Sequence, residues 1–196
     1  MSVQQLTPVT LAGSHVRLEP LTLDHVPALA QAGLHPVLWE LQPAPIRTEE
    51  DMRGYVATAL DDQQRSQSLP FAIVRQQDGE VIGSTRYMDI ALPHRRLEIG
   101  ATWLSPGSQR SGANTEAKLL LLTHAFETLA MIRVVFKTEL LNTPSRQALA
   151  RIGAVEEGVF RQHLIAASGR RRDMVYLSIL EGEWPQVKAE LAARLR

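Results

Sequence analysis

Apolar and polar residues alternate along several short runs of the chain, which is the pattern of half-buried strands. The first run is "HVRLEPL" (15–21). The runs "LPFAIVRQ" and "EVIGSTRYMDI" are separated by Gln77-Asp78-Gly79, and Asp-Gly between two such runs indicates a hairpin. "RRLEIGATWL" (95–104) follows directly. These last three runs therefore predict three consecutive strands in a meander.

Helical patterns with start and stop signals lie between and after these strands. Thr48-Glu-Glu-Asp51 predicts a capped start for one helix, and Gly33 and Gly153 are the stop signals of two others. The predicted helices are 22–32, 48–67, 114–130, 143–152 and the closing "EWPQVKAELAARLR". A strand is predicted over 133–141, and a final hairpin turns at Ser168-Gly169.

The resulting order, β-α-α-β-β-β-α-β-α-β-β-α, is neither a strict βαβ alternation nor all-β. It predicts an α+β fold with one mixed, mostly antiparallel sheet and helices on both faces. A length of 196 residues suits a single domain, so we expect residues 1–196 to form one.

Composition narrows the class of protein. The counts of Lys+Arg and of Asp+Glu are both 21, so charge does not favour nucleic acid or an anionic membrane as a partner. The sequence has no cysteine, which excludes disulfides, thiolate zinc sites and a cysteine nucleophile. Its six histidines show no ligand spacing, so no metal is expected. Without a secretory signal pattern or a membrane-spanning run, we expect a cytoplasmic location.

The connection "LSPGSQRSGANT" (104–115) is long for a strand-to-helix turn and consists almost entirely of small and polar residues. The first N–H groups of a helix have no intrahelical partner and favour an anion such as phosphate. Gly112 permits close approach of the backbone to a ligand. The side-chain donors there are Gln109, Arg110, Ser111, Asn114 and Thr115. A plain helix start, capped by Ser111 or Asn114 with nothing bound, is the alternative.

"QRSGAN" (109–114) resembles the Gln/Arg-x-x-Gly-x-Gly/Ala acyl-CoA loop of the GNAT N-acetyltransferases, with Asn114 in place of the usual final Gly or Ala. The following "TEAK" is similar to the branch that includes the ribosomal-protein-alanine acetyltransferases. The segments "LEIGATWLSP", "NTPSRQALARIGAVEEG" and "RRDMVYLSILEGEWP" also resemble this family, in the same order. The likeness extends from about His15 to Leu191.

This resemblance implies acetyl-CoA as cosubstrate and a primary amine as acceptor, carried by a small molecule or by a protein N-terminus. The loop from Gln109 through Ala113 to Thr115 would hold the pyrophosphate. The backbone of Thr102, Trp103 and Leu104 would pair with the pantetheine arm, in a gap between this strand and the strand at 133–141. A homodimer, known in the family, is one open option for the oligomeric state.

Glu98 is the candidate general base, because a carboxylate on the cosubstrate strand could take the proton of the amine. Simple alternation places Glu98 on one face with Gly100 and Thr102, and puts Leu97, Ile99, Ala101 and Trp103 on the other. The alternative is a surface glutamate paired with Arg95 or Arg96.

Ser145 is the candidate donor to the leaving thiolate, and capping of the helix at Thr143-Pro-Ser is its alternative role. Many family members carry a tyrosine acid seven residues after the asparagine that is Asn142 here, and this chain has Leu149 there. By the same resemblance Asn142 would contact the cofactor arm.

The remaining polar residues that stand out in the sequence are expected to have structural roles or to line the acceptor pocket. Glu156 and Glu157 are expected to be solvated at a turn, 170–172 to be a solvated basic hairpin, and His124 to be a core or cap residue. Position suggests Trp39 with its proline-rich loop, Arg86 and Tyr87 as the acceptor pocket. Two other functions stay open: a non-catalytic acyl-CoA-binding module on the same fold, and a nucleotide-binding enzyme that uses the same helix N-terminus.

Overall fold

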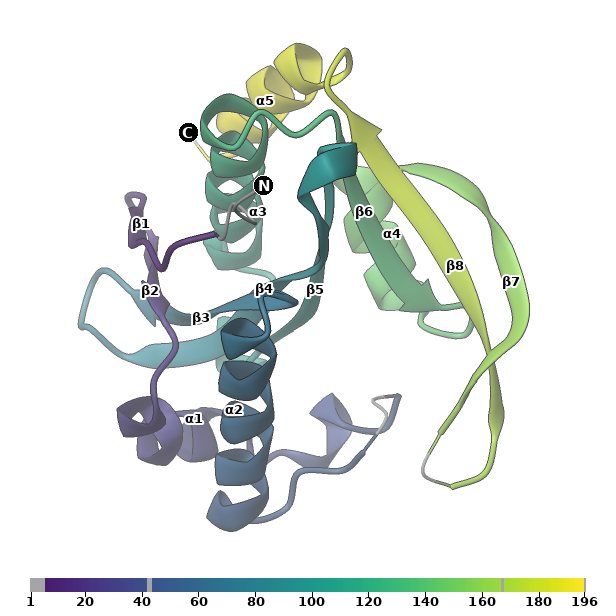
Figure 1. The fold of residues 1–196 in the computed structure, drawn as a ribbon. Coiled ribbons are helices and arrows are strands. Elements are labelled where there is room, and N and C mark those ends of the chain that lie inside the picture. The colour runs from purple at the N-terminus through teal and green to yellow at the C-terminus, as the bar shows by residue number, and fades with distance from the viewer. Residues whose placement is uncertain (1–5, 42–43, 167, 196) are drawn as a thin grey trace.

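The computed structural model describes residues 6–41, 44–166 and 168–195, which form one mixed sheet with helices on both faces (Figure 1). The strand order is β1-β2-β3-β4-β5-β6-β8-β7. The strands are β1 (Leu11–Ala12), β2 (Val16–Pro20), β3 (Ser68–Arg75), β4 (Val81–Ala91), β5 (Arg96–Leu104), β6 (Arg133–Glu139), β7 (Val155–Ile165) and β8 (Arg171–Leu180). β5 and β6 pair in parallel and the other neighbours antiparallel, so the predicted α+β class is confirmed.

The helices divide the apolar residues into two cores, one on each side of the sheet. The α2 side is covered by α1 (Val26–Gly33) and α2 (Glu49–Gln64), whose buried residues pack with Trp103 of β5. The α3 side is covered by α3 (Ala113–Thr123), α4 (Thr143–Arg151) and α5 (Trp184–Ala193), which pack on Leu97 and Ile99. Figure 1 shows α1 and α2 grouped together, apart from α3 and α5.

Local signals in the sequence account for most of these elements. Thr48 accepts a hydrogen bond from the Asp51 N–H at 3.1 Å, and the Asp51 carboxylate accepts one from the Thr48 N–H at 3.0 Å, as the capping prediction required. The hairpin at Asp78-Gly79 joins β3 to β4, and Gly79 has φ 75°. The short β1 was not predicted, and α3 ends earlier than expected, in a π-helical turn over His124–Thr128.

Strands β5 and β6 pair only at their beginnings and then diverge (Figure 1). Their register covers Arg96–Glu98 of β5 and Arg133–Val135 of β6, although β5 continues to Leu104 and β6 to Glu139. The rest of β5 keeps its pairing with β4 on the other edge. The predicted gap between these two strands is therefore confirmed, and it leaves backbone groups of β5 facing it unpaired.

A β-bulge in β5 overturns the predicted alternation of faces. The register passes from Ser84↔Trp103 to Arg86↔Gly100, so β5 has one residue more than β4, and Ala101 has φ 47°. Beyond the bulge the faces exchange: Thr102 lies on the α3 side, and Trp103 lies on the α2 side, opposite to Leu97 and Ile99. Periodicity alone does not reveal the extra residue.

Of the residues expected to be solvated, Glu156, Glu157 and Arg170 are exposed and also form ion pairs, whereas Arg172 is buried. Glu157 lies within β7 rather than at a turn, and its carboxylate pairs with Arg133 and accepts a hydrogen bond from Ser178. Glu139 is 2% exposed and pairs with both Arg170 and Arg172. Glu156 is exposed in β7 and pairs with Arg146.

None of the helices in the described ranges has the length and apolar character that crossing a membrane requires.

Candidate active site

Glu98 lies at the last paired position of β5 before the strands diverge, opposite Val135 of β6. It is 6% exposed, and its Oε2 is 2.7 Å from the Lys137 Nζ, which reaches across from β6. Burial raises the pKa of Glu98, because the desolvation of the carboxylate outweighs the opposing effect of the Lys137 ammonium. The alternative of a surface pair with Arg95 or Arg96 is wrong, since Arg96 pairs with Asp89 and Arg95 lies near Glu181.

The Glu98 carboxylate leans along β5 over Gly100. A Cβ built on Gly100 would lie 2.8 Å from Glu98 Oε1 and 3.0 Å from Met88 Sδ. Any side chain at position 100 would therefore displace the carboxylate. Glycine is required here for space, since its φ is not in the left-handed region.

The α2 side next to Glu98 carries aromatic rings and a buried arginine. Arg86 lies opposite Gly100 on β4, with its guanidinium 4.4 Å from the ring centre of Tyr55. Tyr55 and Trp103 both contact Trp39, at centroid distances of 5.8 Å and 5.5 Å. Trp39 and Arg86 thus lie on the same side as Glu98, as the acceptor-pocket hypothesis requires; residues 42 and 43 of the proline-rich loop lie outside the described ranges.

Tyr87 does not belong to this group. It is fully buried in the α3-side core, where its hydroxyl donates to the Leu121 carbonyl at 2.6 Å and lies 3.2 Å from His124 Nδ1. The prediction that Tyr87 lines the acceptor pocket is wrong, because it alternates with Arg86 on β4. His124 packs against this ring, in agreement with its prediction as a core residue.

The α3 side of the bulge holds a buried lysine that the sequence analysis did not single out. Lys118 of α3 is 5% exposed and donates to the Thr102 Oγ1 at 2.6 Å, and this hydroxyl is 2.8 Å from that of Thr85. Burial lowers the pKa of Lys118 to about 7. The sequence holds one indication of this site, a lysine at the start of the apolar run "AKLLLL". That lysine was interpreted only as part of the family motif "TEAK".

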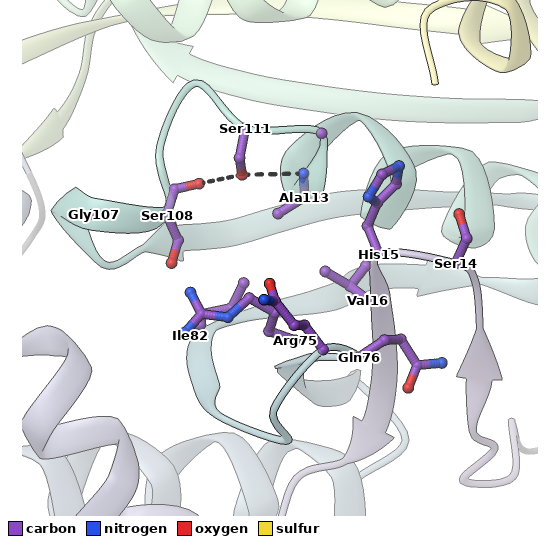
Figure 2. A pocket seen from close by; sticks show the side chains of 12 residues that line it. Ser14, His15, Val16, Arg75, Gln76, Ile82, Gly107, Ser108, Ser111 and Ala113 are labelled. Atoms are coloured by element: carbon purple, nitrogen blue, oxygen red, sulfur yellow. Dashed lines mark hydrogen bonds between the residues drawn. The ribbon is translucent and has the colours of Figure 1, made fainter. Parts of the chain in front are cut away.

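The loop between β5 and α3 folds back on itself. Gln109 Nε2 donates to the Leu104 carbonyl at 3.2 Å. Ser111 Oγ donates to the Ser108 carbonyl at 2.7 Å, as Figure 2 shows. Ser111 Oγ also accepts from the Ala113 N–H at 3.3 Å. The helix N-cap is Gly112, without a side-chain cap, so Asn114 does not cap α3 and Ser111 does so only through this long bond.

Several N–H groups of this loop are available to a ligand. The backbone N–H groups of Arg110, Ser111 and Gly112 have no hydrogen-bond acceptor among the described residues. They precede an eleven-residue helix whose first turn includes Asn114 and Thr115. This arrangement suits an anion such as a diphosphate. Because the Trp103 and Leu104 side chains are buried in opposite cores, only their backbone could contact a ligand in the gap.

The same loop, including Ser111 and Gly112, also faces β2 and β3. A pocket of ≈ 390 Å³ there is lined by residues that include His15, Arg75, Ser108 and Gly112 (Figure 2). Its lining includes no residue of β6 or α4, so it lies apart from the β5–β6 gap. The Glu116 carboxylate fixes this side of α3, because it accepts from the N–H groups of Ser14, His15 and Val16.

Asn142 and Ser145 lie just beyond the end of β6, where α4 begins. Asn142 is the N-cap: its Oδ1 accepts from the Ser145 N–H at 3.1 Å. The capping role considered for Ser145 therefore belongs to Asn142, and the Ser145 hydroxyl has no partner among the described residues. The structure does not bring Ser145 into contact with Glu98.

Among the described residues no group of three or more His, Asp or Glu could hold a metal ion.

Two features point to an acetyltransferase: β5 diverges from β6, and N–H groups before α3 have no acceptor among the described residues. Comparison with known proteins confirms this class. The model of the acetyltransferase (GNAT) domain family matches residues 15–155, so the chain belongs to the GNAT acetyltransferase family. It is an acyltransferase, and acetyl-CoA is the acyl donor that this family uses, as the resemblance implied.

Relatives agree with this assignment. The chain is 36% identical over 107 residues to YdaF of Bacillus subtilis, named as a ribosomal N-acetyltransferase; the match covers 55% of this chain and 57% of YdaF. It is 27% identical to the ribosomal-protein-serine acetyltransferase of Escherichia coli, covering 80% of this chain and 88% of that protein.

Solved structures give the same result. A GCN5-related N-acetyltransferase from Brucella melitensis is 30% identical with a TM-score of 0.91, over 98% of this chain and 88% of that chain. Mycobacterium smegmatis RimJ, solved in complex with CoA-disulfide, is 25% identical with a TM-score of 0.81, over 95% of both chains.

Proposed function

We propose that this protein transfers the acetyl group of acetyl-CoA to a primary amine by direct attack in a ternary complex, with Glu98 as general base. The observation that carries the proposal is the position of Glu98. It is a buried carboxylate with a raised pKa at the point where β5 and β6 diverge. A base is useful there, because the acceptor nitrogen must be neutral to attack.

The proton balance favours such a base. At pH 7 deprotonation costs about 1.4 kcal/mol for an α-amino group and about 4.6 kcal/mol for a lysine amine. Glu98 accepts the proton that the nitrogen loses, directly or through water, while the N–C bond forms and the C–S bond of the thioester breaks. The electron pair of that bond leaves on the CoA thiolate, which Ser145 stabilises by donating its hydroxyl proton in a hydrogen bond.

The cosubstrate contacts follow from the unpaired groups of the chain. The N–H groups at Arg110, Ser111 and Gly112 bind the diphosphate, with Gln109, Ala113, Asn114 and Thr115 completing that loop. The β5 backbone at Thr102, Trp103 and Leu104 pairs with the pantetheine arm, since β6 has turned away. Asn142 contacts the same arm through its amide group, because Oδ1 alone caps α4.

The acceptor is a protein N-terminus or a small amine. Residues 1–196 act as one domain, and its location is the cytoplasm. The names of YdaF and of the Escherichia coli relative support a ribosomal protein as acceptor. A homodimer is compatible with this proposal, which does not require one.

The test combines binding with product detection. Acetyl-CoA at ~100 times its dissociation constant adds about 2.7 kcal/mol to the free energy of unfolding, which raises the melting temperature by roughly 5–10 °C. We expect this rise with acetyl-CoA and none with ATP, and mass spectrometry then detects acetylated members of an amine panel. A rise with ATP alone would indicate a nucleotide enzyme. Binding of acetyl-CoA without any acetylated amine would instead indicate a non-catalytic module.

A further inference from the structure

Arg86 is a buried cation that forms no ion pair with any carboxylate of the described residues. It is 6% exposed, and the described residues include no carboxylate within ion-pair distance of its guanidinium. The residues outside the described ranges include no aspartate or glutamate. Unlike a lysine, arginine does not lose its proton on burial. Burial of an unpaired charge is unfavourable, which points to an external partner.

The surroundings of Arg86 satisfy its donors poorly. Its cross-strand neighbours are Pro70 on β3 and Gly100 on β5, neither of which has a polar side chain. Nη2 reaches the Tyr55 carbonyl only at 3.5 Å, and Nε is buried with no partner among the described residues. The Tyr55 ring holds the guanidinium in place by its face without accepting a conventional hydrogen bond.

Other unsatisfied polar atoms gather on the same side of the sheet. Trp103 Nε1 and Ser68 Oγ are also buried and have no partner among the described residues. Both residues lie on the α2 side, since Trp103 packs in that core and Ser68 is opposite Met88, two positions from Arg86. Two of these three groups can only donate hydrogen bonds. Gln63 Oε1 of α2, an acceptor, is buried without a partner in the described ranges as well, so unsatisfied groups of both kinds lie on this side.

Arg86 is also placed correctly relative to the base. Glu98 precedes Gly100, the cross-strand partner of Arg86, by two residues, so the two side chains are diagonal neighbours on one face. Such neighbours lie about 7–8 Å apart. The Glu98 carboxylate leans over Gly100, toward this position, and Lys137 already neutralises it. The spacing of the two side chains would let an acceptor place its amine at Glu98 and an anionic group at Arg86.

We propose that Arg86 recognises a carboxylate of the acceptor, and that the substrates of this enzyme are amines that carry a carboxylate close to the reacting nitrogen. This inference rests on the proposed acetyl transfer and adds the class of acceptor. The carboxylate comes either from a free amino acid or from an acidic side chain next to a peptide N-terminus. Both sources present the same chemistry to the guanidinium, a planar group that accepts two hydrogen bonds.

The test measures acetylation rates on matched acceptors. One arm compares L-amino acids with their α-amides, and a second compares the peptide amides Ala-Asp-Ala and Ala-Asn-Ala. We expect kcat/KM to be about 10- to 100-fold higher for the carboxylate member of the preferred arm. Arg86→Met should remove this preference, because it raises KM for the carboxylate acceptor more than for its neutral partner. Arg86→Lys should retain part of it.

Arg53→Met is the control, because Arg53 is a more exposed arginine of α2 that pairs with Glu49 and Glu50. A wild-type enzyme that does not discriminate in either arm, or an Arg86→Met variant that discriminates as well as wild type, overturns the proposal. If Arg86→Met does not fold, the wild-type comparison and Arg86→Lys still decide. Acetylation of neutral amines without preference refutes the role of Arg86 alone. No acetylation of any amine refutes the proposed function as well.

Discussion

Two buried cations lie on opposite sides of the β4–β5 pair, and they differ in how their charge is accommodated. Lys118 on the α3 side is 5% exposed and donates to the Thr102 hydroxyl, which is itself hydrogen-bonded to that of Thr85. Arg86 on the α2 side is 6% exposed, and its Nε has no partner among the described residues. The pKa of Lys118 falls to about 7, so this lysine can become neutral near physiological pH.

The difference separates a structural site from a recognition site. A lysine that can lose its proton and reach a hydroxyl tolerates burial, and Lys118 ties α3 to the bulge of β5. A guanidinium keeps its charge, so an arriving carboxylate would compensate the burial of Arg86. On the α3 side Lys118 therefore holds the bulge of β5 in place, whereas on the α2 side Arg86 is proposed to bind the carboxylate of the acceptor.

Removing the base is the strongest way to break the chemistry on the α2 side. We expect Glu98→Gln to lower kcat by about 10²- to 10⁴-fold, because the amide cannot accept the proton of the amine. The measurement is the rate of CoA release with the best amine of the panel, with Glu181→Gln, an exposed glutamate, as control. An unchanged rate in Glu98→Gln would make the base assignment wrong.

The pH dependence of stability sharpens the contrast between the two cations. With a folded pKa of about 7 against 10.5 for an ordinary lysine, the unfolded chain binds more protons than the folded one between these values. The burial penalty of Lys118 is therefore complete below pH 7 and disappears as pH rises toward 10.5. Lys118→Met removes this penalty, so the variant should be more stable than wild type at pH 6.5. This difference in the free energy of unfolding should fall by roughly 3 kcal/mol between pH 6.5 and 9.5.

Chemical denaturation across this pH range checks the prediction. Arg86→Met is the matched control, because arginine stays charged throughout and its replacement should leave the pH slope of wild type unchanged. Equal slopes in Lys118→Met and wild type would contradict the account of Lys118.

Gly100→Ala probes the space between the base and the arginine. Its new Cβ would lie 2.8 Å from Glu98 Oε1 and 3.0 Å from Met88 Sδ, so the carboxylate must move. Since a displacement of about 1 Å can cost 10²-fold in rate, we expect kcat/KM to fall by about 10- to 100-fold. Gly54→Ala is the control, because nothing lies within 4 Å of its Cβ position. Equal activity in both variants would show that the carboxylate position is not constrained.

The smallest expected effect concerns the start of α4. Asn142→Ala removes the acceptor of the Ser145 N–H and should lower the free energy of unfolding by about 1 kcal/mol. If Asn142 also contacts the cosubstrate, KM for acetyl-CoA rises together with this loss. Asn142→Asp retains the cap and loses the amide donor, so it separates the two roles: stability recovers and KM does not.

The sequence predicted the fold class, the element order and the divergence of β5 from β6, because these follow from periodicity, turn residues and a family motif. It did not predict the bulge at Ala101, since a single extra residue leaves the apolar pattern of β5 unchanged. The wrong faces for Thr102 and Trp103 follow from that omission. Lys118, Lys137 and the pairs of Glu157 and Arg172 depend on contacts between distant segments, which local patterns do not encode.

The most direct test of the claim that Arg86 reads the acceptor is an NMR titration of its Nε–Hε group. The signal is assigned by its absence in Arg86→Lys and followed in the presence of CoA. The titrants are the carboxylate acceptor preferred in the rate measurements and its neutral partner. We expect the signal to shift in a saturable way with the carboxylate and to stay in place with the neutral partner. The same shift with both titrants, or no shift with either, would contradict this account.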